Sequence, residues 1–151
     1  MHKLLSAIAL SLICAITACR GNSSTESDDA AAYDLLTRSY NYTEHEQFDS
    51  ALCLLNQALR YNAATDSTRG LVNAEIMTLH LMRGSLDTAI VYGRRAMALT
   101  RGSISTEDYG ILCGNIGIVY RRLGMNDSAA VAYRNGLTEV MRDDKCPDVA
   151  A

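Results

Sequence analysis

The sequence predicts an all-α fold, an α-solenoid of three helix-turn-helix hairpins. One short frame, an Asp followed by Ser or Thr and then Ala, recurs at Asp49, Asp87 and Asp127, with spacings of 38 and then 40 residues. Apolar residues at helical spacing flank each copy of this frame. A frame that repeats at such a period is typical of a repeat array in which each unit is one supersecondary element.

The composition favours this fold class over others. The 151 residues, 48% of them hydrophobic, suffice for one domain with a real core and are too few for two. The absence of Trp, the single Pro and an aromatic content of 6% argue against a β-sandwich or a β-barrel. A formal charge of -3 gives no electrostatic case for binding nucleic acid.

Residues 1–18 are predicted to be a signal peptide. Lys3 precedes an apolar run from Leu4 to Ile16, which is too short to cross a bilayer as a helix and has the layout of a secretory leader. The sequence Ile-Thr-Ala-Cys at its end resembles a bacterial lipobox. On that resemblance Cys19 is acylated and becomes the new N-terminus; the alternative is an ordinary signal peptide followed by an incidental Cys. Arg20 stands where an inner-membrane retention signal has Asp, which favours the outer membrane, with the protein facing the periplasm.

The segment after the leader is predicted to be a tether. Residues 20–29 contain no apolar side chain, so we expect residues 19–29 to form a flexible link between the lipid and the domain. At the other end the helical periodicity is lost and Pro147 ends any helix, so residues 143–151 are predicted to be a disordered tail.

The domain between them, residues 30–142, is predicted to hold the three hairpins at about residues 32–65, 70–103 and 110–142. Polar breaks at 62–68 and 101–106 separate the hairpins, and Ser105 with Asp108 forms a capping-box-like pair at the start of the third. The apolar residues at helical steps are Tyr33, Leu36, Tyr40, Ala51, Leu52, Leu55, Ala58 and Leu59 in the first hairpin, and Leu71, Val72, Ile76, Leu79, Leu81, Ala89, Ile90, Val91, Ala96, Met97 and Leu99 in the second.

The hairpins resemble the tetratricopeptide repeat. That unit has a small residue late in its first helix, Tyr near the end of that helix, Gly before the turn, and Ala in the second helix. These positions are Gly117, Tyr120, Gly124, Ala129, Tyr133 and Gly136 in the third hairpin, Met77, His80, Gly84, Ala89, Gly93 and Ala96 in the second, and Ser39, Tyr42, Glu46, Ala51, Leu55 and Ala58 in the first. Small side chains there let the two helices approach closely. The chain departs from the family in its longer period and in lacking the Pro that closes each unit. In the first hairpin, Glu46 also replaces the Gly that precedes the turn.

The resemblance implies a non-catalytic protein that binds a peptide or protein in a groove lined by the first helix of each hairpin, the A helices. The expected groove residues are Tyr33, Leu36, Tyr40, Leu71, Ala74, Thr78, Ile111, Asn115 and Ile118. This mostly apolar and aromatic set suits the burial of anchor side chains of a partner. An equally supported alternative is that Tyr33 and Tyr40 merely cover the open end of the stack. The best-known groove of the family clamps a C-terminal carboxylate with Lys, Asn and Arg, and that specificity is not expected from Leu36, Tyr40, Glu75, Ile111 and Asn115.

No catalytic, cofactor or metal site is predicted. The sequence contains no G-x-G-x-x-G, P-loop or G-x-S-x-G motif. His45 lies in a cluster of residues 44–46 with Asp49, but the cluster lacks the spacing of a zinc-binding helix. His80 takes the place that Tyr42 and Tyr120 have in the other hairpins, so we expect it to lie in the core or in a helix seam.

Three cysteines remain besides Cys14 in the leader and Cys19. Cys53 and Cys113 lie in different hairpins, too far apart to bridge, and are expected to be free, small apolar residues. Cys146 is the candidate for a disulfide between two chains. The acids Asp49 and Asp87, like Asp127, are predicted to cap the second helices; the alternative is that the Asp-Ser/Thr-Ala frame resembles an O-glycan acceptor pattern of some bacterial secreted proteins.

Three hypotheses for the function follow. The first is a lipid-anchored adaptor in the bacterial cell envelope that binds a peptide or protein. The second is a self-associating or assembly-scaffold module, because no further helix is predicted after Met141 to cover Val131, Leu137 and Val140. The third is the leading piece of a longer sensor or carbohydrate-uptake lipoprotein.

Overall fold

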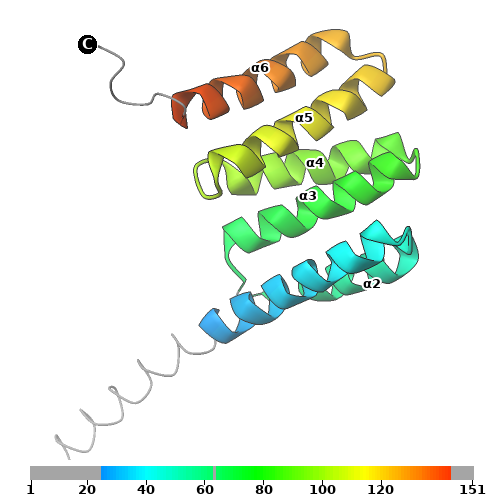
Figure 1. Cartoon of the computed structure of the whole chain (residues 1–151), viewed down its shortest axis with the longest axis vertical. Helices are drawn as coiled ribbons and strands as arrows, with labels where there is room; N and C mark the ends of the chain where they lie inside the picture. The colour runs from blue at the N-terminus through cyan, green and yellow to red at the C-terminus, as the bar shows by residue number, and fades with distance from the viewer. Residues whose placement is uncertain (1–24, 63, 144–151) are drawn as a thin grey trace, which may run out of the picture.

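The structure, a computed structural model, describes residues 25–62 and 64–143. These residues form helices and no strand, so the predicted all-α solenoid is confirmed. The helices pair into three hairpins that follow one another along the long axis of the molecule (Figure 1).

The first hairpin pairs a helix at residues 25–44 with α2 (Phe48–Ala58). The second pairs α3 (Asp66–Met82) with α4 (Leu86–Thr100), and the third pairs α5 (Thr106–Arg122) with α6 (Asn126–Asp143). The A helices are therefore the helix at 25–44, α3 and α5. Adjacent hairpins are joined by packing of α2 on α3 and of α4 on α5.

The three hairpin turns share one backbone conformation. Each has a residue with positive φ, namely Gly84 (φ +76°), Gly124 (φ +74°) and Glu46 (φ +56°). In each turn the N–H of this residue donates to the carbonyl three residues earlier, at 3.0–3.1 Å, and the next N–H donates to the carbonyl five residues earlier, at 2.8–2.9 Å. This pair of bonds is the Schellman motif that ends a helix, and it favours glycine at the left-handed position.

Two A helices begin at capping side chains. The hydroxyl of Ser105 accepts a hydrogen bond from the N–H of Asp108 at 3.0 Å and donates to the Asp108 carboxylate at 2.7 Å, which confirms the predicted capping pair. Thr65 likewise caps α3, since its hydroxyl accepts a bond from the N–H of Thr68 at 3.2 Å. Each cap satisfies a backbone donor that the helix itself leaves free.

The second helices begin differently from the prediction. The capping residues of α2 and α4 are Gln47 and Ser85, and neither makes a side-chain capping bond. Asp49, Asp87 and Asp127 are each the second residue of their helix, so the prediction that they are caps is wrong. Their negative charges still favour the positive end of the helix dipole.

Glycines allow the closest approaches between helices. A Cβ at Gly117 would overlap the Tyr133 ring, and one at Gly136 would lie 2.8 Å from the Cys113 Cβ and 3.2 Å from a carbonyl oxygen of the facing helix. The predicted packing role of small residues is confirmed at these positions. It is wrong for Gly124, which serves the turn instead, and at Gly114 of α5 a Cβ would meet nothing within 4 Å.

The buried apolar residues form two clusters, one across each boundary between hairpins. The first comprises Ala32, Leu35, Leu36, Ala51, Leu55, Ala58, Ala64, Val72, Ile76 and Leu79. The second comprises Met77, Leu81, Ala89, Ala96, Leu112, Ile116, Val119 and Ala132. Each hairpin thus buries its apolar face against the next, as expected of a repeat array.

The ends of the described chain differ from the predicted boundaries. Residues 25–29 are helical, so the prediction of a flexible tether is wrong there. The reason is tertiary: Asp29 Oδ1 accepts a hydrogen bond from the Thr65 N–H at 2.7 Å, which fastens the start of the helix to the loop before α3. At the other end, Asp143 is the last residue of α6 instead of the first of the tail.

The remaining predictions for the termini fall on residues that the structure does not describe. These are the signal peptide at 1–18, the lipid-bearing Cys19, the first part of the tether, the cysteine at 146 and the tail at 144–151. Within residues 25–62 and 64–143, no helix combines the length and the apolar character needed to cross a membrane.

Candidate functional site

Hydrogen bonds between side chains tie each A helix to the next. The hydroxyl of Thr43 donates to Glu75 Oε1 at 2.9 Å, which joins the helix at 25–44 to α3. The amide of Asn115 donates to the Thr78 hydroxyl at 3.3 Å, which joins α3 to α5. These bonds place part of each A helix on one common surface.

Side chains at helical spacing from these bonds extend the surface along each helix. Tyr40 and Tyr33 lie three and ten residues before Thr43, and Ile111 lies four residues before Asn115. We call this surface the A-helix face and define it by Tyr33, Tyr40, Thr43, Glu75, Thr78, Ile111 and Asn115.

The predicted groove residues differ widely in their exposure. Tyr33, Tyr40 and Ile111 expose 53%, 42% and 56% of their surface. The other five that remain accessible are partly buried, namely Leu71, Ala74, Thr78, Asn115 and Ile118. Of these, Leu71 packs against the first core cluster, whereas Ala74 and Ile118 pack against the second.

Leu36 is a correction to the predicted groove. Only 1% of its surface is exposed, and it belongs to the first core cluster together with Ile76 of α3. The residues at the same position of the second and third hairpins are Ala74 and Gly114, which are much smaller. The larger side chain of Leu36 therefore fills space between hairpins instead of facing a partner.

Glu75 is the charged group of the A-helix face that the predicted groove omitted. Its side chain is partly buried, and burial raises the pKa of the Glu75 carboxyl, although the hydrogen bond from Thr43 acts in the opposite direction. Among the described residues no Lys, Arg or His nitrogen lies within 4.0 Å of its carboxylate. Extending the helical spacing from Leu71 by four residues would have found Glu75 in the sequence.

Tyr40 lies in the same negative environment. Burial raises the pKa of Tyr40 to about 12, and the charges of Glu75, Tyr33 and Asp108 act in the same direction. Asp108 stands in the first turn of α5, three residues before Ile111, so all three A helices contribute to this environment. The A-helix face therefore combines exposed aromatic and apolar side chains with carboxylates.

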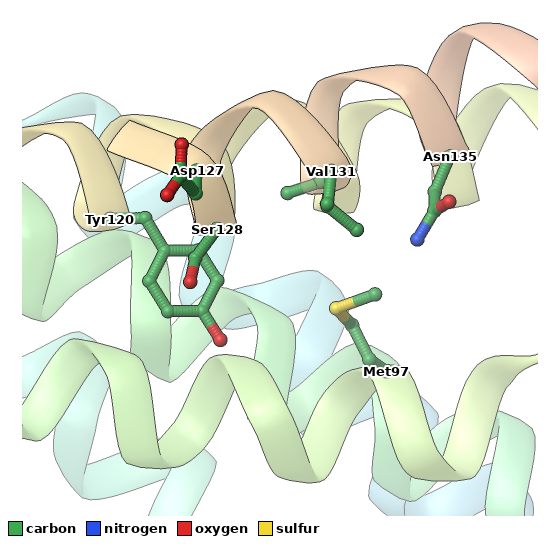
Figure 2. A pocket seen from close by; sticks show the side chains of 7 residues that line it. Met97, Tyr120, Asp127, Ser128, Val131 and Asn135 are labelled. Carbon is green, nitrogen blue, oxygen red and sulfur yellow. The ribbon is translucent and has the colours of Figure 1, made fainter. Parts of the chain in front are cut away.

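A hollow lies away from the A-helix face, between α4 and α6 and over the end of α5 (Figure 2). Its volume is about 320 Å³, which suits a single side chain or small group. Figure 2 shows Tyr120 below the start of α6, and Met97 and Asn135 at the other end. Arg94 already holds the Tyr120 hydroxyl at 3.2 Å. The lining contains no His, Cys, Lys or Arg and comprises Met97, Tyr120, Asp127, Ser128, Val131, Ala132 and Asn135.

The histidines and cysteines take structural places. His80 stacks on Tyr92 of α4 with 5.9 Å between ring centroids and 13° between planes, so the predicted seam position is confirmed. The Nδ1–H of His45 donates to the Asn41 carbonyl at 2.7 Å within its own helix. Cys53 is exposed and Cys113 is buried, and both are free. In the described part of the chain, no three His, Cys, Asp or Glu side chains are close enough together to hold a metal ion.

The outer side of α6 is partly apolar. Val131, Leu137 and Met141 expose 51%, 61% and 59% of their surface. Val140, which was expected on the same bare surface, is partly buried because it packs over Gly110 of α5.

Comparisons with known proteins show the fold. No family model matches the sequence, and no curated protein matches it. The similar solved structures include the second tetratricopeptide-repeat domain of Spaghetti (RPAP3) bound to the HSP90 peptide SRMEEVD, MamA, and BtubC (BKLC) from P. vanneervenii.

Their TM-scores against this chain are 0.65, 0.63 and 0.68, at identities of 14%, 16% and 18%. They cover 77%, 77% and 93% of this chain, which in turn covers 97%, 62% and 58% of theirs. The chain therefore has a tetratricopeptide-repeat-like fold. At these identities the similarity shows the fold and nothing further.

Proposed function

We propose that this chain is a non-catalytic binding module that takes up a peptide segment of a partner protein on the A-helix face. The observation that carries the proposal is the exposure of Tyr33, Tyr40 and Ile111 on helices that hydrogen bonds hold side by side. Exposed aromatic and apolar side chains on a rigid support are what an interface uses as anchors. Binding of a peptide by the similar repeat domain of RPAP3 supports the same use of the fold.

The non-catalytic part of the proposal is supported by the chemistry of the candidate sites. The hydroxyl of Ser128 in the hollow beside α6 has no His or Lys among the lining residues to act as its base. His80 has its Nδ1 buried without a partner and its ring stacked, so it is not directed at an open site.

The test of the proposal is capture of partners by the full chain from a membrane extract, followed by mass spectrometry. We expect Tyr33→Glu combined with Ile111→Glu to abolish capture, because both side chains are exposed and their loss leaves the core intact. Val91→Glu is the matched control, since Val91 is 46% exposed on α4, outside the A-helix face. Equal capture by the double variant and the parent protein would contradict the proposal.

We further propose that the module works in the bacterial cell envelope, held by a lipid on Cys19 in the outer membrane and facing the periplasm. The support is the leader and the lipobox-like sequence before Cys19. Each buried methylene of an acyl chain contributes about 0.8 kcal/mol, so more than one chain gives stable anchoring. Cys19→Ser should move the protein from the membrane fraction to the soluble fraction and abolish labelling with radioactive palmitate; unchanged labelling would contradict the anchor.

Self-association is a second candidate function, favoured by the exposure of Val131, Leu137 and Met141 on α6. An array whose last helix is uncovered presents the surface on which the next repeat would pack. Light scattering of the chain without residues 1–19 tests this. A concentration-dependent increase in mass that Leu137→Glu removes supports self-association, and a monomer at all concentrations contradicts it.

A further inference from the structure

We infer that the A-helix face recognises a lysine or arginine side chain of its partner, with the cation held by Glu75 beside the Tyr40 ring. This inference rests on the proposed function and specifies the chemistry of the partner.

The Glu75 carboxylate is partly buried, and no described residue places a compensating positive charge beside it. Within residues 25–62 and 64–143 its one hydrogen-bond partner is the neutral hydroxyl of Thr43, at 2.9 Å. Glu139, which is also partly buried, has Arg142 Nη1 at 2.9 Å. A partly buried ionised carboxylate is unfavourable unless it is paired, so a cation supplied by a partner would relieve the cost that the free protein carries.

The groups around Glu75 fit the rest of a basic side chain. Tyr40 is close enough for the Glu75 charge to raise its pKa, and a phenol ring attracts a cation placed over its face. Asp108, in the first turn of α5, acts on the pKa of Tyr40 in the same direction as Glu75. The aliphatic part of Lys or Arg packs on apolar surface while its charged end stays polar, and Tyr33 and Leu71 supply such surface on the two neighbouring helices.

Three of the four arginines of the A helices have partners elsewhere, and the fourth, Arg121, stands in the last turn of α5. Arg38 pairs with Asp34 at 3.4 Å, and Arg69 lies 3.9 Å from Asp66, each within its own helix. Arg122 donates to the Leu81 carbonyl at 3.3 Å, near the far end of α3.

At the turn after α3, Arg83 pairs with Asp49 at 2.7 Å. The negative charge at Glu75 is therefore not neutralised from within the described residues. By charge complementarity, this surface fits a positively charged segment and disfavours an acidic one.

The test uses a phage-displayed library of random peptides of about twelve residues, panned against the full chain. We expect the enriched peptides to share a Lys or Arg. A synthetic copy of one of them should lose affinity about tenfold when that residue is replaced by Met, and by a similar factor on Glu75→Gln. The two changes together should cost little more than either alone, because they remove the same interaction.

Matched variants separate this inference from the proposed function. Glu75→Gln keeps an oxygen that accepts the Thr43 bond, so thermal unfolding should show an intact fold, and Glu139→Gln on α6 should leave peptide affinity unchanged. Peptides that need Tyr33 and Ile111 but lack a shared basic residue, or that ignore Glu75→Gln, overturn the inference and leave the proposed function standing. Peptides that also bind the double variant Tyr33→Glu, Ile111→Glu contradict both the inference and the proposed function. A library that shows no enrichment contradicts both as well.

Discussion

Replacing Glu46 by Gly should stabilise the protein, because the first hairpin turn holds a non-glycine residue in the left-handed conformation. Glu46 has φ +56°, whereas the equivalent residues Gly84 and Gly124 have φ +76° and +74°. The bonds that close the turns have nearly the same lengths in all three. The first turn therefore adopts the same geometry as the others with a less suitable residue.

The size of the effect follows from three contributions. Release of the left-handed strain gives roughly 1–2 kcal/mol. The greater freedom of Gly in the unfolded chain takes back about 0.5–1 kcal/mol. Removal of a negative charge from a helix C-terminus adds about 0.3 kcal/mol. Among the described residues the exposed Glu46 side chain makes no hydrogen bond or ion pair that would be lost, so we expect a net gain of about 1 kcal/mol.

Thermal unfolding followed by circular dichroism at the helix band measures this gain. A gain of about 1 kcal/mol corresponds to a rise in Tm of roughly 4 °C for a domain of this size. The reverse change, Gly124→Glu, should lower stability by about 1–2 kcal/mol. A Glu46→Gly variant less stable than the parent, or a neutral Gly124→Glu, would show that the turns are not in the left-handed conformation.

Two further predictions concern glycines and a carboxylate. Gly136→Ala should destabilise the protein by about 1–3 kcal/mol, because the new Cβ would meet the Cys113 side chain and a backbone carbonyl. Gly114→Ala should stabilise it by about 1 kcal/mol, because a Cβ there faces open space. Urea unfolding of the two variants and the parent measures both effects. Burial raises the pKa of Glu75 in the folded state, so its deprotonation lowers stability as the pH rises through that pKa. Glu75→Gln should therefore be more stable than the parent at pH 7, and the difference should vanish below the ordinary glutamate pKa of 4.5, as unfolding at several pH values will show.

Local features of the array could be predicted from the sequence because they repeat. The small residue at Gly136 recurs as Ala96 and Ala58, each at the same distance from its turn, and all three are buried where helices pack closely. The capping pair of Ser105 and Asp108 was equally local, since both partners lie within one helical turn. Such features need no knowledge of how one hairpin sits on the next.

The predictions for Leu36 and for residues 25–29 were wrong because contacts with the next hairpin determine the structure at these positions. Leu36 lies between Tyr33 and Tyr40 at helical spacing, and periodicity cannot separate a residue that faces solvent from one that the neighbouring α3 covers. The helix at residues 25–29 depends on the bond from Thr65 to Asp29, whose partners are 36 residues apart. A purely polar segment gives no sign of that contact, so the sequence alone predicts a tether there.

The misplaced helix caps have a different cause, which is the register of the turn. The left-handed residue and the one after it complete the Schellman motif, so the second helix starts two residues beyond the left-handed position. That register puts Asp87 second in α4, where its charge meets the helix dipole but its side chain does not cap. A two-residue error in the register of a turn thus changes the role assigned to the same side chain in all three repeats.

Glu75 shows how a stability measurement and a binding measurement together decide between two roles. If the carboxylate serves the fold through Thr43, then Glu75→Gln should leave stability unchanged or lower it, and peptide affinity should change only as far as the fold does. If the carboxylate is held for a cation of the partner, the same change should stabilise the free protein and weaken the complex, because the unpaired charge is unfavourable alone and favourable when bound. Opposite signs in the two measurements cannot come from a general loss of structure. The unpaired, partly buried state of this carboxylate in the described chain is what makes the second outcome the expected one.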